Sequence, residues 1–223
     1  MQAKQENITT ADGKRIAALV YEADKPKLFA VYTHMMPRTK ESWEEIAIFF
    51  AGLGVTGIAI DLRGHGEADG GPDGFEEFTP KEHQSGIFDI EAAAGYLKEK
   101  YGAAEQNTVV FGASIGANLS LWYAKDHAAC PAAILFSPGL DYKGILATPL
   151  ASALHQGQKI YLVASHKDFA GGSDNAEQNK AIFDVIPPGV LKEITIHEDA
   201  GHGTDIVSND AQVLGKIAAF IGV

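Results

Sequence analysis

Short apolar runs alternate along this chain with longer stretches in which apolar residues recur every three or four positions. The short runs are bounded by turn residues and predict strands at 27–34, 55–61, 108–111, 132–136, 159–164 and 192–197. The periodic stretches predict helices over 40–53, 80–101, 115–125, 173–185 and 204–221. Two further strand patterns, 7–10 and 15–22, precede them and are joined as a hairpin at Asp12-Gly13.

The order of these elements favours an α/β fold. Strands that alternate with helices form a mainly parallel sheet with helices on both faces. We therefore expect an eight-stranded sheet in which the N-terminal hairpin is antiparallel. No linker-like, repeated or low-complexity segment divides the chain, so we expect one domain spanning 1–223.

Residues that can perform acyl-transfer chemistry follow three of the predicted strands. Ser114 follows the strand at 108–111, Asp168 follows the strand at 159–164, and His202 follows the last strand. The carboxyl ends of parallel strands meet at one edge of the sheet, and ligands bind there in such folds. One rim is therefore predicted to carry a hydroxyl, a carboxylate and an imidazole.

The pentapeptide Gly112-Ala113-Ser114-Ile115-Gly116 has the pattern G-x-S-x-G between a predicted strand and a predicted helix. A serine hydroxyl is a weak nucleophile, so it must be exposed on a sharp turn with a base beside it. The small glycines allow such a turn. The N–H of Ile115, at the start of the helix, is then a candidate donor to an oxyanion.

Each of the three residues has a predicted role. Ser114 is the candidate nucleophile, and His202 is the candidate base that takes its proton and returns it to the leaving group. Asp168 would orient the imidazole and stabilise its protonated form. Two other acids compete for that role: Asp174, which is expected to begin the next helix, and Asp199, which is close to the histidine.

This set of motifs resembles the α/β-hydrolase superfamily over nearly the whole chain. The most specific parts are the pentapeptide around Ser114, the strand-end sequence Asp61-Leu62-Arg63-Gly64-His65-Gly66, the position of Asp168, and Ala200-Gly201-His202-Gly203. Small bacterial carboxylesterases and lipase-like hydrolases are the most similar members. Serine at position 114 distinguishes the chain from dienelactone hydrolases, which are similar in size but have cysteine there.

The resemblance also implies a second oxyanion donor. It falls on the residue after the family's His-Gly pair, which is Met36 here. The chain departs from the family pattern, because Met35 occupies the glycine position and Pro37 follows. The residues alone leave open whether the amide of Met35 or that of Met36 completes the oxyanion hole.

The resemblance further bears on substrate access. Larger family members insert a cap domain after the strand that ends here at 136, whereas only 139–157 separates that strand from the next. We therefore expect a minimal cap or none. The open cleft would be walled by Met35, Leu140, Tyr142 and Phe169.

The composition argues against several classes of protein. The chain has 29 acidic and 18 basic residues, a formal net charge of −11 and no basic cluster, so no nucleic-acid partner is expected. No apolar run reaches the roughly 18–20 residues of a membrane-spanning helix, and the N-terminus lacks an apolar signal segment. Cys130 is the only cysteine, so no internal disulfide can form. These features favour a cytoplasmic protein and leave open a homodimer.

No cofactor and no metal are predicted. Neither G-x-x-x-x-G-K-[ST] nor a G-x-G-x-x-G that opens a helix occurs. His65 follows a strand end, as His34 and His202 do, but no H-E-x-x-H, H-x-H or cysteine pattern accompanies them. We interpret Arg63 and His65 as residues that fix their loop, and the remaining histidines, including His83, as surface or helix-end residues.

The leading hypothesis is a serine hydrolase that cleaves small short- to medium-chain carboxylic esters through an acyl-enzyme. The same triad would serve a thioesterase, a lysophospholipase or an acyltransferase, because the motifs describe acyl transfer rather than its partners. A prolyl-oligopeptidase-type peptidase fits less well, since that family usually adds a large N-terminal domain. A ligand-binding protein with silent chemistry is the alternative from another class.

Overall fold

One eight-stranded sheet forms the centre of the molecule. The computed structural model describes residues 2–170 and 172–223. The strands lie in the order β1-β2-β4-β3-β5-β6-β9-β10, in which β1, β2 and β4 pair antiparallel and the other neighbours pair parallel. They are β1 (Lys4–Thr9), β2 (Arg15–Tyr21), β3 (Leu28–Thr33), β4 (Val55–Ile60), β5 (Thr108–Ala113), β6 (Ala132–Phe136), β9 (Lys159–Ser165) and β10 (Leu191–His197). The predicted mainly parallel sheet with an N-terminal antiparallel hairpin is confirmed.

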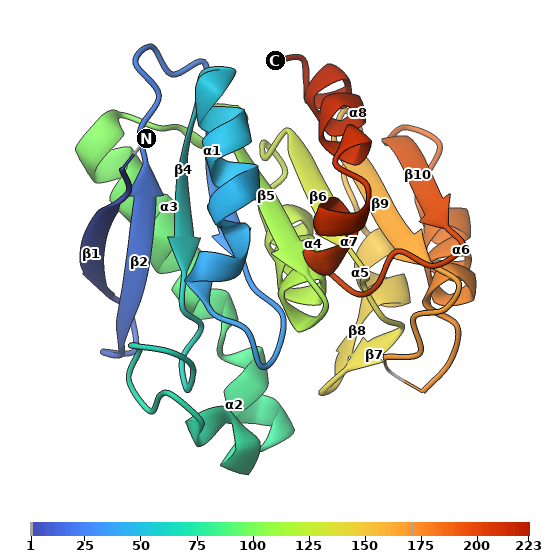
Figure 1. Cartoon of the computed structure of the whole chain (residues 1–223), viewed down its shortest axis with the longest axis horizontal. Coiled ribbons are helices and arrows are strands. Elements are labelled where there is room, and N and C mark those ends of the chain that lie inside the picture. The colour runs from blue at the N-terminus through green and yellow to red at the C-terminus, as the bar shows by residue number, and fades with distance from the viewer. Residues whose placement is uncertain (1, 171) are drawn as a thin grey trace.

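Helices cover both faces of this sheet (Figure 1). On one face lie α1 (Glu44–Gly52), α7 (Asp205–Asn209) and α8 (Gln212–Ile221), and on the other α3 (Ile87–Tyr101), α4 (Ile115–Asp126), α5 (Ala147–Ser152) and α6 (Asn175–Val185). Successive strand residues face opposite sides, so Val110 packs in one core cluster and Phe111 in the other. None of the helices in the described residues is both long enough and apolar enough to cross a bilayer.

The carboxyl ends of the parallel strands share one edge of the sheet. Beyond that edge lie the short helix α2 (Pro80–Gln84) and the hairpin of β7 (Asp141–Tyr142) and β8 (Ile145–Leu146) (Figure 1). The segment between β6 and β9 therefore holds this hairpin and the short helix α5. No larger cap is inserted there, as expected.

Two helices predicted as continuous are each divided in two. The helix predicted over 80–101 is interrupted at Ser85 and Gly86, where the Ser85 hydroxyl donates to the Lys81 carbonyl at 3.0 Å. The helix predicted over 204–221 is interrupted at Asp210, whose backbone is not helical and whose Oδ1 accepts the N–H of Gln212 at 3.0 Å. Both breaks depend on side chains that satisfy backbone groups at a helix end. Shorter 3₁₀ turns occupy Lys40–Trp43, Gly74–Glu77 and Glu105–Asn107.

Candidate active site

Ser114 lies on a sharp turn between β5 and α4. Its φ of 55° and ψ of −122° are rare for a residue other than glycine and cost of the order of 1–3 kcal/mol. Close backbone packing explains the flanking glycines. A Cβ at Gly112 would lie 2.2 Å from the Gly116 carbonyl oxygen, and one at Gly116 would lie 2.3 Å from the Thr33 carbonyl oxygen. Larger residues cannot replace either glycine without moving the turn that carries Ser114.

His202 and Asp168 form a close pair at the same edge. His202 Nδ1 lies 2.6 Å from Asp168 Oδ2, and the aspartate side chain is only 2% exposed. The other carboxylate oxygen accepts the N–H of Ala170 at 3.0 Å. A carboxylate on Nδ1 fixes the tautomer in which Nε2 is free to accept a proton. This is the arrangement that a general base requires.

The elbow of Ser114 and the loop of His202 are anchored on neighbouring residues. The Ser114 N–H donates to the carbonyl of Phe136 at 2.8 Å. The N–H of Gly203 donates to Ser137 Oγ at 2.9 Å. Gly203 also packs against the residue before the serine, since a Cβ on it would lie 3.3 Å from Ala113 Cβ. Ser114 and His202 therefore lie in two loops that pack against each other.

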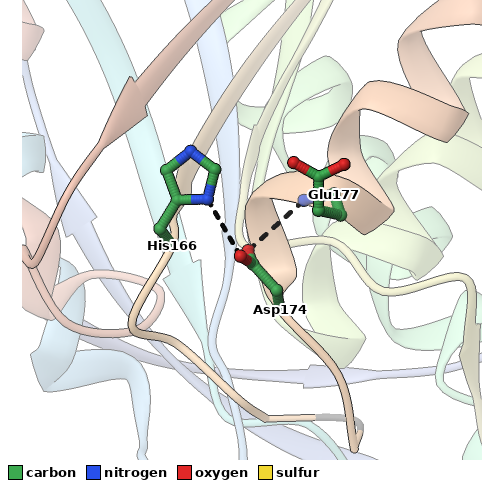
Figure 2. A group of neighbouring side chains, drawn as sticks. All are labelled: His166, Asp174 and Glu177. Carbon is green, nitrogen blue, oxygen red and sulfur yellow. Dashed lines mark hydrogen bonds and ion pairs between the residues drawn. The ribbon is translucent and has the colours of Figure 1, made fainter.

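Asp174 takes part in a different set of contacts (Figure 2). Its Oδ1 accepts the N–H of Ala176 at 2.9 Å and caps α6, and its Oδ2 lies 2.9 Å from His166 Nδ1. His166 lowers the pKa of this carboxyl. Ligand atoms of His166, Asp174 and Glu177 lie within 4.8 Å of one another, but Glu177 pairs with Lys180 at 2.5 Å. The helix cap and the two ion pairs account for this cluster without a metal ion.

The second competing acid is also engaged elsewhere. Asp199 Oδ2 lies 3.3 Å from Lys167 Nζ, and the Asp199 side chain is 63% exposed. Asp168 is therefore the carboxylate that contacts His202.

The two predicted oxyanion donors come from different parts of the chain: Ile115 directly follows Ser114, and Met36 lies in the loop after β3. Ile115 is the first residue of α4, where helix N–H groups have no partner within the helix. The Met35 carbonyl oxygen lies 3.0 Å from His34 Nδ1 and accepts the N–H of Arg38 at 2.8 Å. Because the N–H of a trans peptide points away from its C=O, these contacts direct the Met36 N–H to the opposite side.

His34 is held as a neutral donor to that carbonyl. Its Nε2 accepts the N–H of Leu62 at 2.9 Å, which leaves the proton on Nδ1. Burial, and then the nearby His65 ring, lower the pKa of His34 to about 3. His34 is therefore neutral at neutral pH, and its Nδ1–H donates to the Met35 carbonyl.

The four residues predicted to wall the cleft differ in exposure. Leu140 is 39% exposed and Phe169 is 66% exposed. Met35 is only 3% exposed, and its sulfur would lie 2.4 Å from a Cβ on Gly203. Met35 therefore packs in the core under the histidine loop, and its burial does not fit the prediction that it lines the cleft.

Tyr142, the fourth of these residues, brings a polar group to the site. Its ring packs against Gly139, where a Cβ would lie 2.7 Å from the ring. Burial raises the pKa of Tyr142 to about 12, and the neighbouring Ser114 side chain opposes this shift. The hydroxyl is buried and has no hydrogen-bond partner within the described chain. It is therefore a protonated donor next to the serine.

Comparison with known proteins decides the family. A family model described as serine aminopeptidase, S33, matches residues 24–184, which is well over half of the chain. The chain belongs to this family of α/β hydrolases. A search of curated proteins finds no match for this S33-family hydrolase.

Solved structures share the fold of this S33-family chain at low sequence identity. The protein DcsB, solved with a substrate analogue, has a TM-score of 0.82 at 16% identity, covering 99% of this chain and 98% of DcsB. An esterase of Pyrococcus furiosus has a TM-score of 0.77 at 16% identity, covering 99% and 92%. A predicted CIB-like hydrolase of Thermoplasma acidophilum has a TM-score of 0.73 at 19% identity, covering 100% of both chains. These neighbours support the α/β-hydrolase fold.

Two supporting groups of this S33-family site have contacts that the sequence does not reveal. The buried amide of Asn118, one turn after Ser114, donates to the carbonyls of Gly139 and Ile145 at 2.9 and 2.8 Å. It thereby ties the hairpin that carries Tyr142 to the helix behind the serine. An asparagine four residues after the elbow serine is the only sequence signal for this role.

The second group belongs to the strand-end sequence 61–66, which follows β4 and is held by buried ion pairs. Arg63 lies 2.7 Å from Asp89 and 2.6 Å from Asp12, and its guanidinium is almost fully buried. Buried Asp61 lies 2.8 Å from Lys40 Nζ. These contacts agree with the interpretation of Arg63 as a residue that fixes its loop.

Proposed function

We propose that the chain is a serine hydrolase that cleaves small carboxylic esters with short to medium acyl groups. The observation that carries the proposal is the buried contact between His202 Nδ1 and Asp168 Oδ2 at 2.6 Å, in a loop that is bonded beside the Ser114 elbow. An imidazole oriented in this way can activate a neighbouring hydroxyl.

In the proposed reaction, Ser114 Oγ attacks the ester carbonyl while His202 Nε2 takes the hydroxyl proton. The negative oxygen of the tetrahedral intermediate accepts hydrogen bonds from the N–H groups of Ile115 and Met36. Collapse breaks the bond to the alcohol oxygen, which leaves with the proton from His202. Water then attacks the acyl-enzyme by the same route and releases the carboxylic acid and the free serine.

The surroundings support a small, accessible substrate. Leu140 and Phe169 are exposed, and only the short hairpin and α5 lie between β6 and β9. The same geometry could transfer an acyl group from a thioester, a lysophospholipid or a peptide to water, or to another acceptor. The ester proposal predicts that esters react faster than matched amides, and the family's description as an aminopeptidase makes that comparison informative.

A panel of chromogenic esters of increasing acyl length tests the proposal. Turnover should be highest for short and medium chains, and a fluorophosphonate should label the wild type but not Ser114→Ala. A matched anilide of the preferred acyl group measures amide hydrolysis beside it. Absence of both turnover and labelling would contradict the hydrolase proposal and favour a protein with silent chemistry.

A further inference from the structure

A small cavity lies beside the two proposed oxyanion donors. Met36 and Ile115 line it together with the apolar side chains of Leu62, Phe78 and Leu119. Its volume is about 10 Å³. That is close to the space that one water molecule requires. The cavity can accept a hydroxyl-sized group but not an alkyl chain.

Two buried histidines also line this cavity. His65 is 2% exposed and His83 is 6% exposed, so His83 is buried rather than on the surface, although it lies in the last turn of α2, the helix-end position that the sequence also allowed. Within residues 2–170 and 172–223, the Nε2 atoms of both rings are buried and lack a hydrogen-bond partner. A buried polar atom without a partner costs about 1–3 kcal/mol. A ligand group that satisfies these nitrogens would recover that free energy.

The state of His65 determines which ligand group fits. Its Nδ1 lies 3.1 Å from the Arg63 carbonyl oxygen, so the proton is on Nδ1 and Nε2 carries a lone pair. Burial lowers the pKa of both rings, that of His83 to about 4, so both are neutral at neutral pH. His65 Nε2 is therefore an acceptor and needs a donor, which a hydroxyl provides and an alkyl, ether or ketone group does not.

We propose that this cavity binds a hydroxyl on the acyl part of the substrate, so that the enzyme prefers esters of short hydroxy acids to matched alkyl esters. The inference rests on the proposed ester hydrolysis. Because Met36 and Ile115 both line the cavity, a substrate whose carbonyl oxygen accepts from their amides would bring the first carbons of its acyl chain beside it. A hydroxyl on the second or third carbon then reaches His65 and His83, and longer alkyl chains extend away from it into the open cleft.

The test compares ethyl butanoate with the two enantiomers of ethyl 3-hydroxybutanoate, with acid release followed at constant pH. The wild type should prefer one hydroxy ester, because a fixed acceptor distinguishes the enantiomers. In His83→Leu, the ratio of kcat/KM for the hydroxy ester to that for the alkyl ester should fall about tenfold, the effect expected of one lost hydrogen bond. His83→Asn, which keeps polar atoms, should recover part of the ratio. Exposed His155 offers a control, and His155→Leu should leave the ratio unchanged.

Two other outcomes would overturn the inference in distinguishable ways. If esters are hydrolysed but the wild type shows neither a hydroxy preference nor an enantiomer preference, the cavity holds only a structural water. If the ratio is the same in the wild type, His83→Leu and His83→Asn, His83 does not contact the acyl group. Absence of all turnover and of serine labelling would instead contradict the proposed function itself. Thermal unfolding of each variant confirms that the compared proteins are folded.

Discussion

Two aspartate–histidine pairs lie in the same group of loops, and their surroundings differ. Asp168 and His202 are 2.6 Å apart, with the aspartate side chain 2% exposed, whereas Asp174 and His166 are 2.9 Å apart, with side chains 30% and 32% exposed. The first pair lies in loops that are bonded beside the serine elbow, and the second caps a helix. An aspartate next to a histidine is therefore no sign of catalysis by itself. Burial and the connection to the nucleophile distinguish the two.

The largest expected difference comes from removing each histidine. His202→Ala should lower kcat for a short ester by roughly 10⁴–10⁶-fold, because the serine loses its base. His166→Ala should remain within about threefold of the wild type, because its ring contacts a helix cap. Initial rates at saturating ester measure both. Equal losses in the two variants would show that the exposed pair also serves the reaction.

Removing each carboxylate should give a somewhat smaller difference. Asp168→Asn should lower kcat by roughly 10³–10⁴-fold, because the imidazole loses its orienting acceptor. Asp174→Asn is the matched control and should retain nearly full activity. If the Asp174 variant were inactive and the Asp168 variant active, the role of the acid would pass to Asp174.

Histidines outside both pairs should make stability depend on pH. Burial lowers the pKa of His34 to about 3 and that of His83 to about 4, below the value of roughly 6.5 in an unfolded chain. Between about pH 6.5 and pH 4 the unfolded state binds more protons, so the free energy of unfolding falls as the pH falls. The slope approaches about 1.4 kcal/mol per pH unit for each such histidine.

Urea denaturation between about pH 7 and pH 5 measures this slope, in a range where most carboxylates stay ionised. His83→Leu should reduce the slope by up to one proton's contribution. The same slope in His83→Leu and the wild type would mean that His83 can bind a proton in the folded state.

The smallest expected effect is on thermal stability and comes from removing Asp174, the acid of the exposed pair with His166. Asp174→Ala should lower the melting temperature by roughly 2–4 °C, because α6 loses its N-cap. Differential scanning calorimetry at neutral pH measures it. Asp199→Ala, which removes an exposed carboxylate at no helix end, should change the melting temperature by less.

The strands of the sheet and the positions of the candidate catalytic residues could be predicted from the sequence, because both leave local patterns in it. Strands such as Val55–Ile60 and Thr108–Ala113 are buried at every position, so they form continuous apolar runs. In a parallel sheet, the residue that follows each run lies at a common edge. The positions of Ser114, Asp168 and His202 therefore followed from local patterns, although their catalytic roles remain proposals.

The features that the sequence did not predict depend on contacts between distant residues. At the break between α2 and α3, Gly86 packs against α4, since a Cβ on it would lie 3.0 Å from a Leu119 side-chain carbon. His83 lies in the polar sequence Pro80–Gln84, and the cavity that it lines also includes Leu62 and Leu119, which other segments supply. The two-residue strands β7 and β8 are too short to show a period. None of these contacts leaves a periodic signal along the chain.

The N–H groups of Ser114 and Gly203 donate to Phe136 and Ser137, so the elbow and the histidine loop are both anchored to the end of β6. The spacing between these two loops is therefore independent of the tip of the neighbouring hairpin at Lys143 and Gly144, where both residues have positive φ. A lid grafted at that tip could exchange one range of substrates for another while the reacting groups keep their positions. In this S33-family chain the groups proposed to react and the tip of the hairpin are therefore held by different contacts, the tip by the bond from Gln84 Nε2 to the Lys143 carbonyl at 3.0 Å.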